Sequence, residues 1–208
     1  IASAVLLSAC EAPNKEETDK TIVGVVDETN LNEIMLTVAD PNQAVDYFRD
    51  AVTKDPSRTD LKRNLAVSLV RAKRAQEAVE VYKLLDGQNA LAPQDRVDYA
   101  DALIRISNWA DAKKQLNSVP PSLETFQRYR LEAIVADSEK KWERADSFYQ
   151  TAASLTTKPA GVLNNWGFSK LTRKDYKGAE TLFLKAITSD RTLFTAKNNL
   201  VLARASRK

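Results

Sequence analysis

Two pairs of acidic side chains are spaced in a way that could support acid–base catalysis. Asp98 and Asp101 are three residues apart, and so are Glu77 and Glu80. On a helix this spacing places two carboxylates on one face, where one could donate a proton and the other accept one. Basic residues stand beside both pairs, which is the usual pattern of a solvated helix surface. The chain is therefore not predicted to be an enzyme.

The remaining side chains offer little other reactive chemistry. The 208 residues include no histidine and a single cysteine. Histidine is the commonest general acid or base and the commonest neutral metal ligand, so neither role has its usual residue here. One thiol cannot form an intramolecular disulfide or a thiolate metal site. We expect no metal, no cofactor and no small-molecule substrate.

The composition indicates a helical protein that does not bind nucleic acid. Lys and Arg total 31 against 28 Asp and Glu, and the small net charge of +3 is interleaved along the chain, without a basic patch. Only five glycines and seven prolines are present, and the abundant Ala, Leu, Lys and Glu favour helices. No stretch reaches the roughly 18 apolar residues that a membrane span needs.

The cysteine stands at the end of an apolar segment, "AVLLSAC" at residues 4–10. Polarity changes abruptly after Cys10, at "EAPNKEETDK", as it does after the apolar core and small residues of a secretory signal. Because the chain begins with Ile and not with Met, we expect upstream residues of this signal to be missing. Residues 1–9 are thus interpreted as a signal-peptide remnant.

The run Leu7-Ser8-Ala9-Cys10 resembles the lipobox of bacterial lipoproteins. That resemblance implies that Cys10 is lipidated and becomes the mature N-terminus, and several acyl chains on one cysteine give a firm membrane anchor. In such lipoproteins an aspartate after the cysteine favours inner-membrane retention, and Glu11 stands here instead. The expected location is the outer membrane, facing the periplasm, with residues 10–29 as a flexible tether.

A period of 34 residues runs through the rest of the chain. Alanines that are followed by an aromatic residue or Leu four positions later recur at spacings of 34, 34, 33 and 34, at Ala44, Ala78, Ala112, Ala145 and Ala179. Small residues stand twelve positions before four of these five alanines. Such a period in register resembles the tetratricopeptide (TPR) repeat.

The resemblance predicts an all-α TPR α-solenoid, a right-handed superhelix, over residues 30–208. The expected units are 30–58, 59–92, 93–125, 126–159 and 160–193, with a C-terminal capping helix at 194–208. Gly167 and Ala179 should face each other across one helix pair, because small residues let the two helices approach closely. Trp109, Trp142 and Tyr176, which precede three of the alanines, are interpreted as core residues.

TPR proteins bind protein segments on a concave surface that is lined mainly by the first helix of each unit. The asparagines at equivalent positions, Asn64, Asn165 and Asn199, could pair with the backbone of an extended peptide. In full, the predicted groove consists of Arg63, Asn64, Val67, Arg71, Asp98, Asp101, Arg105, Arg130, Ile134, Asn164, Asn165, Phe168, Asn198 and Asn199. Leu131 is expected on the same inner face.

Residues 34–85, together with the lipobox and the five-unit layout, resemble TadD, the TPR lipoprotein of tight-adherence (Tad/Flp) pilus systems. The resemblance implies a pilotin-like role in assembling or localising the pilus secretin, so the expected partner is a secretin or another pilus component. The alternative is a lipid-anchored scaffold for other envelope machinery, such as peptidoglycan enzymes or outer-membrane protein assembly. The identity of the neighbouring genes would distinguish the pilus role from the scaffold role.

Overall fold

The computed structural model describes residues 30–207, and all regular secondary structure within that range is helical. A first helical segment covers residues 30–37. The helices that follow are α2 (Pro41–Lys54), α3 (Thr59–Arg71), α4 (Ala75–Gly87), α5 (Pro93–Arg105), α6 (Trp109–Asn117), α7 (Phe126–Ser138), α8 (Trp142–Ser154), α9 (Ala160–Thr172), α10 (Tyr176–Ser189) and α11 (Phe194–Ser206). The predicted all-α fold class is confirmed.

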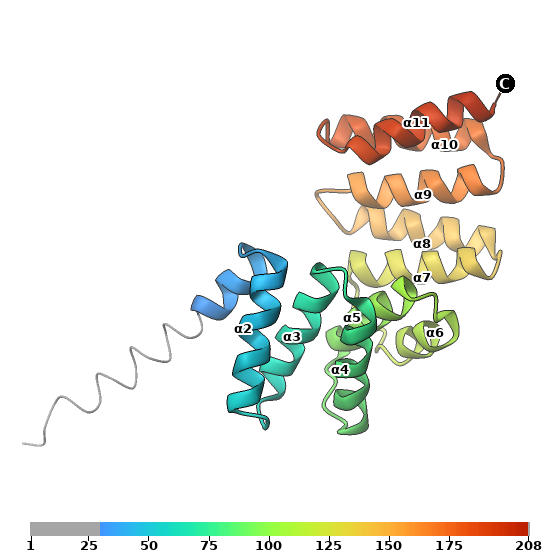
Figure 1. Ribbon diagram of the computed structural model, residues 1–208. Helices are drawn as coiled ribbons and strands as arrows, with labels where there is room; N and C mark the ends of the chain where they lie inside the picture. Colours follow the sequence, from blue (N-terminus) through green and yellow to red (C-terminus); the bar gives the residue numbers. More distant parts are fainter. Residues whose placement is uncertain (1–29, 208) are drawn as a thin grey trace, which may run out of the picture.

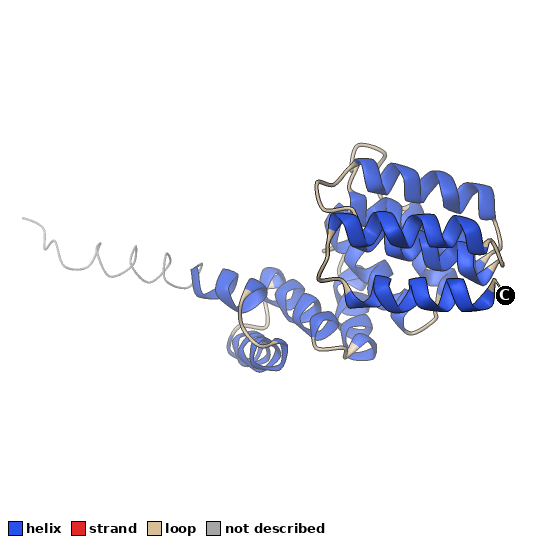
Figure 2. Ribbon diagram, turned by 90° about the horizontal axis from the view of Figure 1, so that it is seen from above, coloured by secondary structure: helices blue, strands red, loops and turns tan. Residues whose placement is uncertain are grey.

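Consecutive helices pack against each other from α2 to α11, which gives an elongated solenoid. Figure 1 shows α7 to α11 side by side in one stack, with α2 to α4 running in a different direction. Seen from above, in Figure 2, the N-terminal helices extend away from that stack. The arrangement follows from the repeat, because each helix pair buries its apolar face only against its neighbours.

Side chains fix where several helices begin. The side chains of Asp40, Asn108, Thr125 and Asp175 each accept a hydrogen bond from a backbone N–H in the first turn of α2, α6, α7 and α10. These bonds satisfy donors that a helix start leaves unpaired. None of the helices within residues 30–207 is long and apolar enough to cross a membrane.

The turn inside each full helix pair has the same backbone conformation. One residue adopts a positive φ, between 58° and 66°, at Lys73, Ser107, Lys140 and Lys174. In each turn two backbone N–H groups bond back to carbonyls of the preceding helix, as when Lys140 donates to Asp137 and Lys141 to Ala136, both at 2.9 Å. This is the Schellman motif, which usually employs glycine. No glycine stands at these four positions, so the motif was not predicted.

The repeating alanines lie at the centre of the helix contacts. Ala44, Ala78, Ala112, Ala145 and Ala179 are all fully buried, and Gly167 is buried as well. The large side chains four positions after the alanines, among them Phe48, Tyr82, Tyr149 and Phe183, are at most 2% exposed. They fill the space between successive pairs and join neighbouring helices through apolar contacts.

Candidate protein-binding groove

A groove of about 670 Å³ lies on the C-terminal half of the solenoid. Its walls come mainly from α7 and α9, which begin successive pairs, and from α11, which follows the last pair. α6 contributes its first residue, Trp109, and α8 contributes Tyr149. We call it the C-terminal groove, and its lining residues are Trp109, Ile134, Asp137, Ser138, Tyr149, Asn164, Asn165, Phe168, Ser169, Thr172, Thr195 and Asn199. A concave surface built by first helices is the place where TPR solenoids hold partner segments.

Five of the predicted groove residues line it: Ile134, Asn164, Asn165, Phe168 and Asn199. Phe168 is 49% exposed although it is aromatic, so its ring is available to a partner. The Asn199 side-chain amide donates to the Asn164 amide oxygen at 3.0 Å, whereas Asn165 makes no side-chain hydrogen bond within the described part of the chain. The Asn165 amide can therefore donate and accept toward a bound backbone.

Three of the predictions for this half of the chain need correction. Trp109 was interpreted as core, but its side chain is 38% exposed and lines the C-terminal groove. Trp109 and Trp142 occupy the same position in the repeat, so the sequence pattern does not distinguish them. Only the path of α6 in the structure shows that Trp109 lies at the groove. Leu131 was expected on the inner face, and it is buried, with 1% exposure. Asn198 is exposed on α11 outside the groove lining.

A polar network that the repeat pattern does not predict lies in the wall of the groove. The carboxylate of Asp137, on α7, accepts hydrogen bonds from the Tyr149 hydroxyl at 2.9 Å and from the Ser169 hydroxyl at 2.7 Å. Tyr149 and Ser169 are both buried, and Asp137 is half-buried. Burial raises the pKa of Asp137, although the two hydroxyl donors oppose that effect. Three helices are thus joined by one side chain at the groove.

The two predicted arginines of α3 have roles within the fold. Arg63 forms an ion pair with Asp95 at 2.6 Å and also donates to the backbone carbonyl of Ala90. Arg71 donates to the carbonyls of Met35 at 2.9 Å and Ala39 at 3.0 Å. Both guanidinium groups hold neighbouring backbone in place, and we therefore leave them out of the proposed binding surface.

The predicted residues of α5 and α7 near the middle of the chain form an ion-pair cluster. Asp101 pairs with Arg105 at 2.8 Å and with Arg130 at 3.5 Å. Asp98 accepts a hydrogen bond from the Gln94 amide at 3.1 Å. Burial is the main cause that raises the pKa of Asp98 to about 6, and neighbouring carboxylates add to it. Asn64 and Val67 on α3 are part-exposed, and neither lines the C-terminal groove.

The two acidic pairs differ in their surroundings. Asp101 pairs with Arg105 and Arg130, and no hydrogen bond joins its carboxylate to that of Asp98 within residues 30–207. Glu77 pairs with Arg74 at 2.6 Å, and the hydrogen bonds from Arg74 lower the pKa of its carboxyl. Asp101 and Glu77 are thus engaged in ion pairs with arginines, whereas Asp98 accepts a hydrogen bond from the neutral Gln94 amide.

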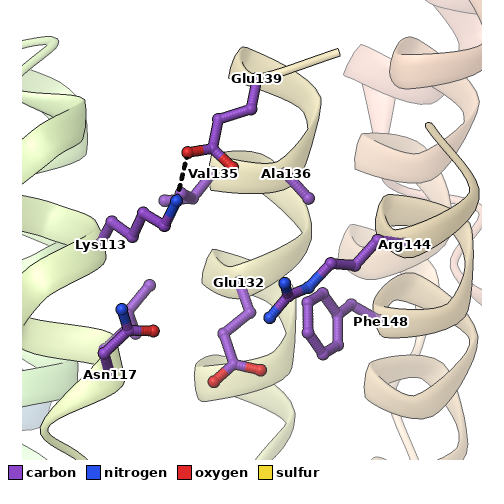
Figure 3. Close-up of a pocket in the computed structure, with 9 residues that line it drawn as sticks. Lys113, Asn117, Glu132, Val135, Ala136, Glu139, Arg144 and Phe148 are labelled. Carbon is purple, nitrogen blue, oxygen red and sulfur yellow. Dashed lines mark hydrogen bonds and ion pairs between the residues drawn. The ribbon is translucent and has the colours of Figure 1, made fainter. Parts of the chain in front are cut away.

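A second, much smaller crevice lies between α6, α7 and α8, and Figure 3 shows its lining. Its volume is about 40 Å³. Lys113 donates to Glu139 at 2.5 Å, and the bonds from Lys113 and Lys141 lower the pKa of Glu139 to about 2. The Arg144 guanidinium lies over the Phe148 ring, 5.2 Å from its centre. The crevice is too small for a peptide, and its charged groups contact one another.

The predicted lipidation site, Cys10, and the predicted tether at 10–29 lie outside the described residues. They stay predictions from the sequence. The units and the capping helix were predicted over 30–208, and the structure describes all but the last of those residues.

Comparison with solved structures agrees with the repeat. A chain of the APC/C hetero-tetramer Cut9–Hcn1 is similar over 92% of this chain, with a TM-score of 0.74 and 16% identity, and this chain spans only 40% of its length. A thermophilic TPR protein from Thermus thermophilus is similar over 85% of this chain and 96% of its own, with a TM-score of 0.70 and 13% identity. YrrB, described as a TPR protein with an unusual peptide-binding site, has a TM-score of 0.59 and 14% identity over 88% of this chain and 97% of its own.

No protein-family model matches the sequence, and no curated protein matches it. At these identities the structural likeness establishes the fold. The chain folds as a TPR α-solenoid, as the 34-residue period predicted. Such solenoids present concave surfaces for protein–protein interaction, and the C-terminal groove is a surface of that kind.

Proposed function

We propose that this chain is a lipid-anchored TPR adaptor that assists assembly or localisation of a Tad/Flp pilus secretin, in the manner of a pilotin. The C-terminal groove is the observation that carries the binding role, because it combines exposed aromatic side chains with an uncommitted amide. The membrane anchor is supported by the lipobox-like run that ends at Cys10. The pilus system is supported by the resemblance of residues 34–85 to TadD.

Binding in the groove requires no chemical step. An extended segment of the partner would lie along α7, α9 and α11, where Asn165 can pair with its backbone. Phe168 and Trp109, which are 49% and 38% exposed, would cover an apolar side chain of that segment. Aromatic residues of this kind are enriched at the energetically dominant positions of protein interfaces. The lipid would bring this groove to the membrane in which the secretin multimer assembles.

Co-purification of the secretin multimer from outer membranes tests the groove. The double variant Asn165→Ala/Phe168→Ala should recover at least about tenfold less secretin than the wild type, since truncating a hot-spot residue of an interface costs about 2 kcal/mol or more. Lys174→Glu, in the exposed turn between α9 and α10, is the control and should recover the wild-type amount. Full capture by the double variant, with loss on changing a residue outside the groove, would exclude this mechanism.

A second experiment tests the anchor. Cys10→Ser should incorporate no labelled palmitate and should accumulate as precursor or away from the outer membrane. Equal labelling of the variant and the wild type would refute lipidation at this residue. If wild-type membranes yield peptidoglycan enzymes or outer-membrane assembly proteins and no secretin, the envelope-scaffold alternative replaces the pilus proposal.

A further inference from the structure

The polar network at Asp137 occurs in one repeat and is not required by the TPR fold. The positions in register with residue 137 carry Val70, Ile104 and Leu171, which are all aliphatic. Tyr82 occupies in α4 the position that Tyr149 occupies in α8, and its buried hydroxyl has no hydrogen-bond partner in the described part of the chain. The repeat therefore tolerates an aliphatic side chain at the position of Asp137. The carboxylate is a particular feature of this groove.

Asp137 is the one charged side chain among the residues that line the C-terminal groove. Lys170 on α9 pairs with Asp146 at 3.0 Å, and Arg173, directly after α9, pairs with the same carboxylate. Burial raises the pKa of Asp137 and the charge of Arg173 acts to lower it, but Arg173 forms no ion pair with Asp137. Within residues 30–207, Asp137 forms no ion pair. The groove thus presents a single negative charge without a cation in its own lining.

The carboxylate also retains capacity for further hydrogen bonds. Each oxygen accepts one bond, from Tyr149 or from Ser169, whereas a carboxylate offers about four acceptor sites. A half-buried charge in a mostly apolar groove is costly unless it is paired. A cation from a partner would supply that pairing. Ile134 lies one turn before Asp137 on α7, and Phe168 precedes Ser169 on α9, so apolar side chains flank the charge.

From this arrangement we infer that the C-terminal groove selects extended protein segments carrying a lysine or arginine beside a large apolar residue. The cation pairs with the Asp137 carboxylate, and the apolar side chain contacts Phe168 and Trp109. The inference rests on the proposed function only in taking the C-terminal groove as the site that binds a protein segment. It does not depend on whether the partner is a secretin.

A peptide library tests this selection on the full-length chain in detergent. The probes are acetylated, amidated heptapeptides with one fixed phenylalanine and one scanned position, which holds Lys, Arg, norleucine or Glu while the other positions are randomised. The wild type should bind the Lys and Arg pools at least about tenfold more tightly than the norleucine pool, and the Glu pool least, as partly buried charge pairs at interfaces do. Binding is followed by tryptophan fluorescence, and the Trp109→Phe variant shows which part of the change comes from the groove.

Variants assign the preference to its residue. Asp137→Asn should bind the Lys and norleucine pools equally, whereas Asp50→Asn, which removes an exposed carboxylate on α2, should keep the wild-type preference. Circular dichroism shows whether each variant is folded. The comparison of pools on the wild type needs no variant, so a misfolded Asp137→Asn leaves the inference open to refutation.

The outcomes separate this inference from the proposed function. Equal binding of the Lys and norleucine pools by the wild type, or preference for Glu, overturns cation selection, while secretin capture by the groove would stand. Binding of no pool also overturns it, because a segment of the stated chemistry was offered. Loss of secretin capture in Asn165→Ala/Phe168→Ala decides the proposed function independently.

Discussion

A Cβ atom on residue 167 would lie 2.7 Å from the nearest carbon of the Phe183 ring, so Gly167 and Phe183 are fitted to each other across the α9–α10 pair. Two further ring carbons lie 2.8 and 3.1 Å from the same point. Phe183 is fully buried, so its ring has little freedom to move aside. The sequence predicted that Gly167 faces Ala179, and the atoms nearest to a Cβ at residue 167 are instead three ring carbons of Phe183.

Gly167→Ala should lower the free energy of unfolding by about 1 kcal/mol, since overpacking of about 1–3 kcal/mol exceeds the helix-propensity gain of about 1 kcal/mol. Urea unfolding measures the change. Gly161→Ala, in the same helix, is the control, because a Cβ there meets no atom within 4 Å, and it should not destabilise. In a Phe183→Leu background the cost at residue 167 should shrink. An undiminished cost would show that the ring is not its cause.

Asp98→Asn should stabilise the protein at neutral pH and have no effect in acid. The folded pKa of about 6 lies above the ordinary value of 3.8, so the folded state retains a proton that the unfolded state releases, and stability falls as pH rises between the two values. Asparagine removes this penalty, which is worth about 1–3 kcal/mol above pH 7. The test is to compare the free energies of unfolding of wild type and variant, measured with urea at neutral pH and in acid below the ordinary pKa. A gain of equal size under both conditions would contradict this origin.

Arg71→Met should loosen the N-terminal end of the solenoid without affecting the C-terminal groove. The variant keeps the aliphatic stem but loses the bonds to the carbonyls of Met35 and Ala39. Hydrogen exchange of residues 30–39 should accelerate by roughly tenfold or more, because each bond from a charged donor contributes about 1.5–3 kcal/mol. Arg105→Met, at a more exposed ion pair, is the control. Unchanged exchange at residues 30–39 would show that Arg71 does not hold this segment.

Lys140→Gly should stabilise the turn between α7 and α8. A side chain at a positive φ costs about 1 kcal/mol, which glycine avoids. Lys140→Ala is the matched control, because alanine removes the charge and keeps the Cβ, so it should be neutral. Thermal unfolding of the two variants gives the comparison. Equal stabilisation by both variants would show that the lysine charge, and not the backbone conformation, causes the effect.

The period of the alanines predicted the helices because packing in a solenoid is local, and each repeat meets the same neighbours. The groove was predicted in part for the same reason. Asn165, Phe168 and Asn199 line it because register fixes which face of a first helix points inward. Asp137 was missed, although its signal was present in the sequence. It is an acidic residue at a position where three other repeats carry aliphatic side chains.

Other features could not be predicted from register. Arg63 and Arg71 reach backbone carbonyls about 30 residues away in sequence, and the direction of a long side chain is not encoded by spacing. Trp109 shares its repeat position with Trp142, yet it lines a groove because the solenoid changes direction near α6 (Figure 1). The turn residues with positive φ carry no glycine, so the usual mark of that backbone conformation was absent.

The walls of the C-terminal groove come from α6 onward, and α11 is at once the last helix of the stack and one of those walls. The two ends of the molecule therefore differ in how well they tolerate the insertion or deletion of a repeat unit. A whole unit inserted or deleted before residue 93 would change the length of the solenoid and leave the recognition surface intact. Trimming the other end by even one helix would remove Thr195 and Asn199 together with the cover of α10, so stability and recognition would be lost in the same cut.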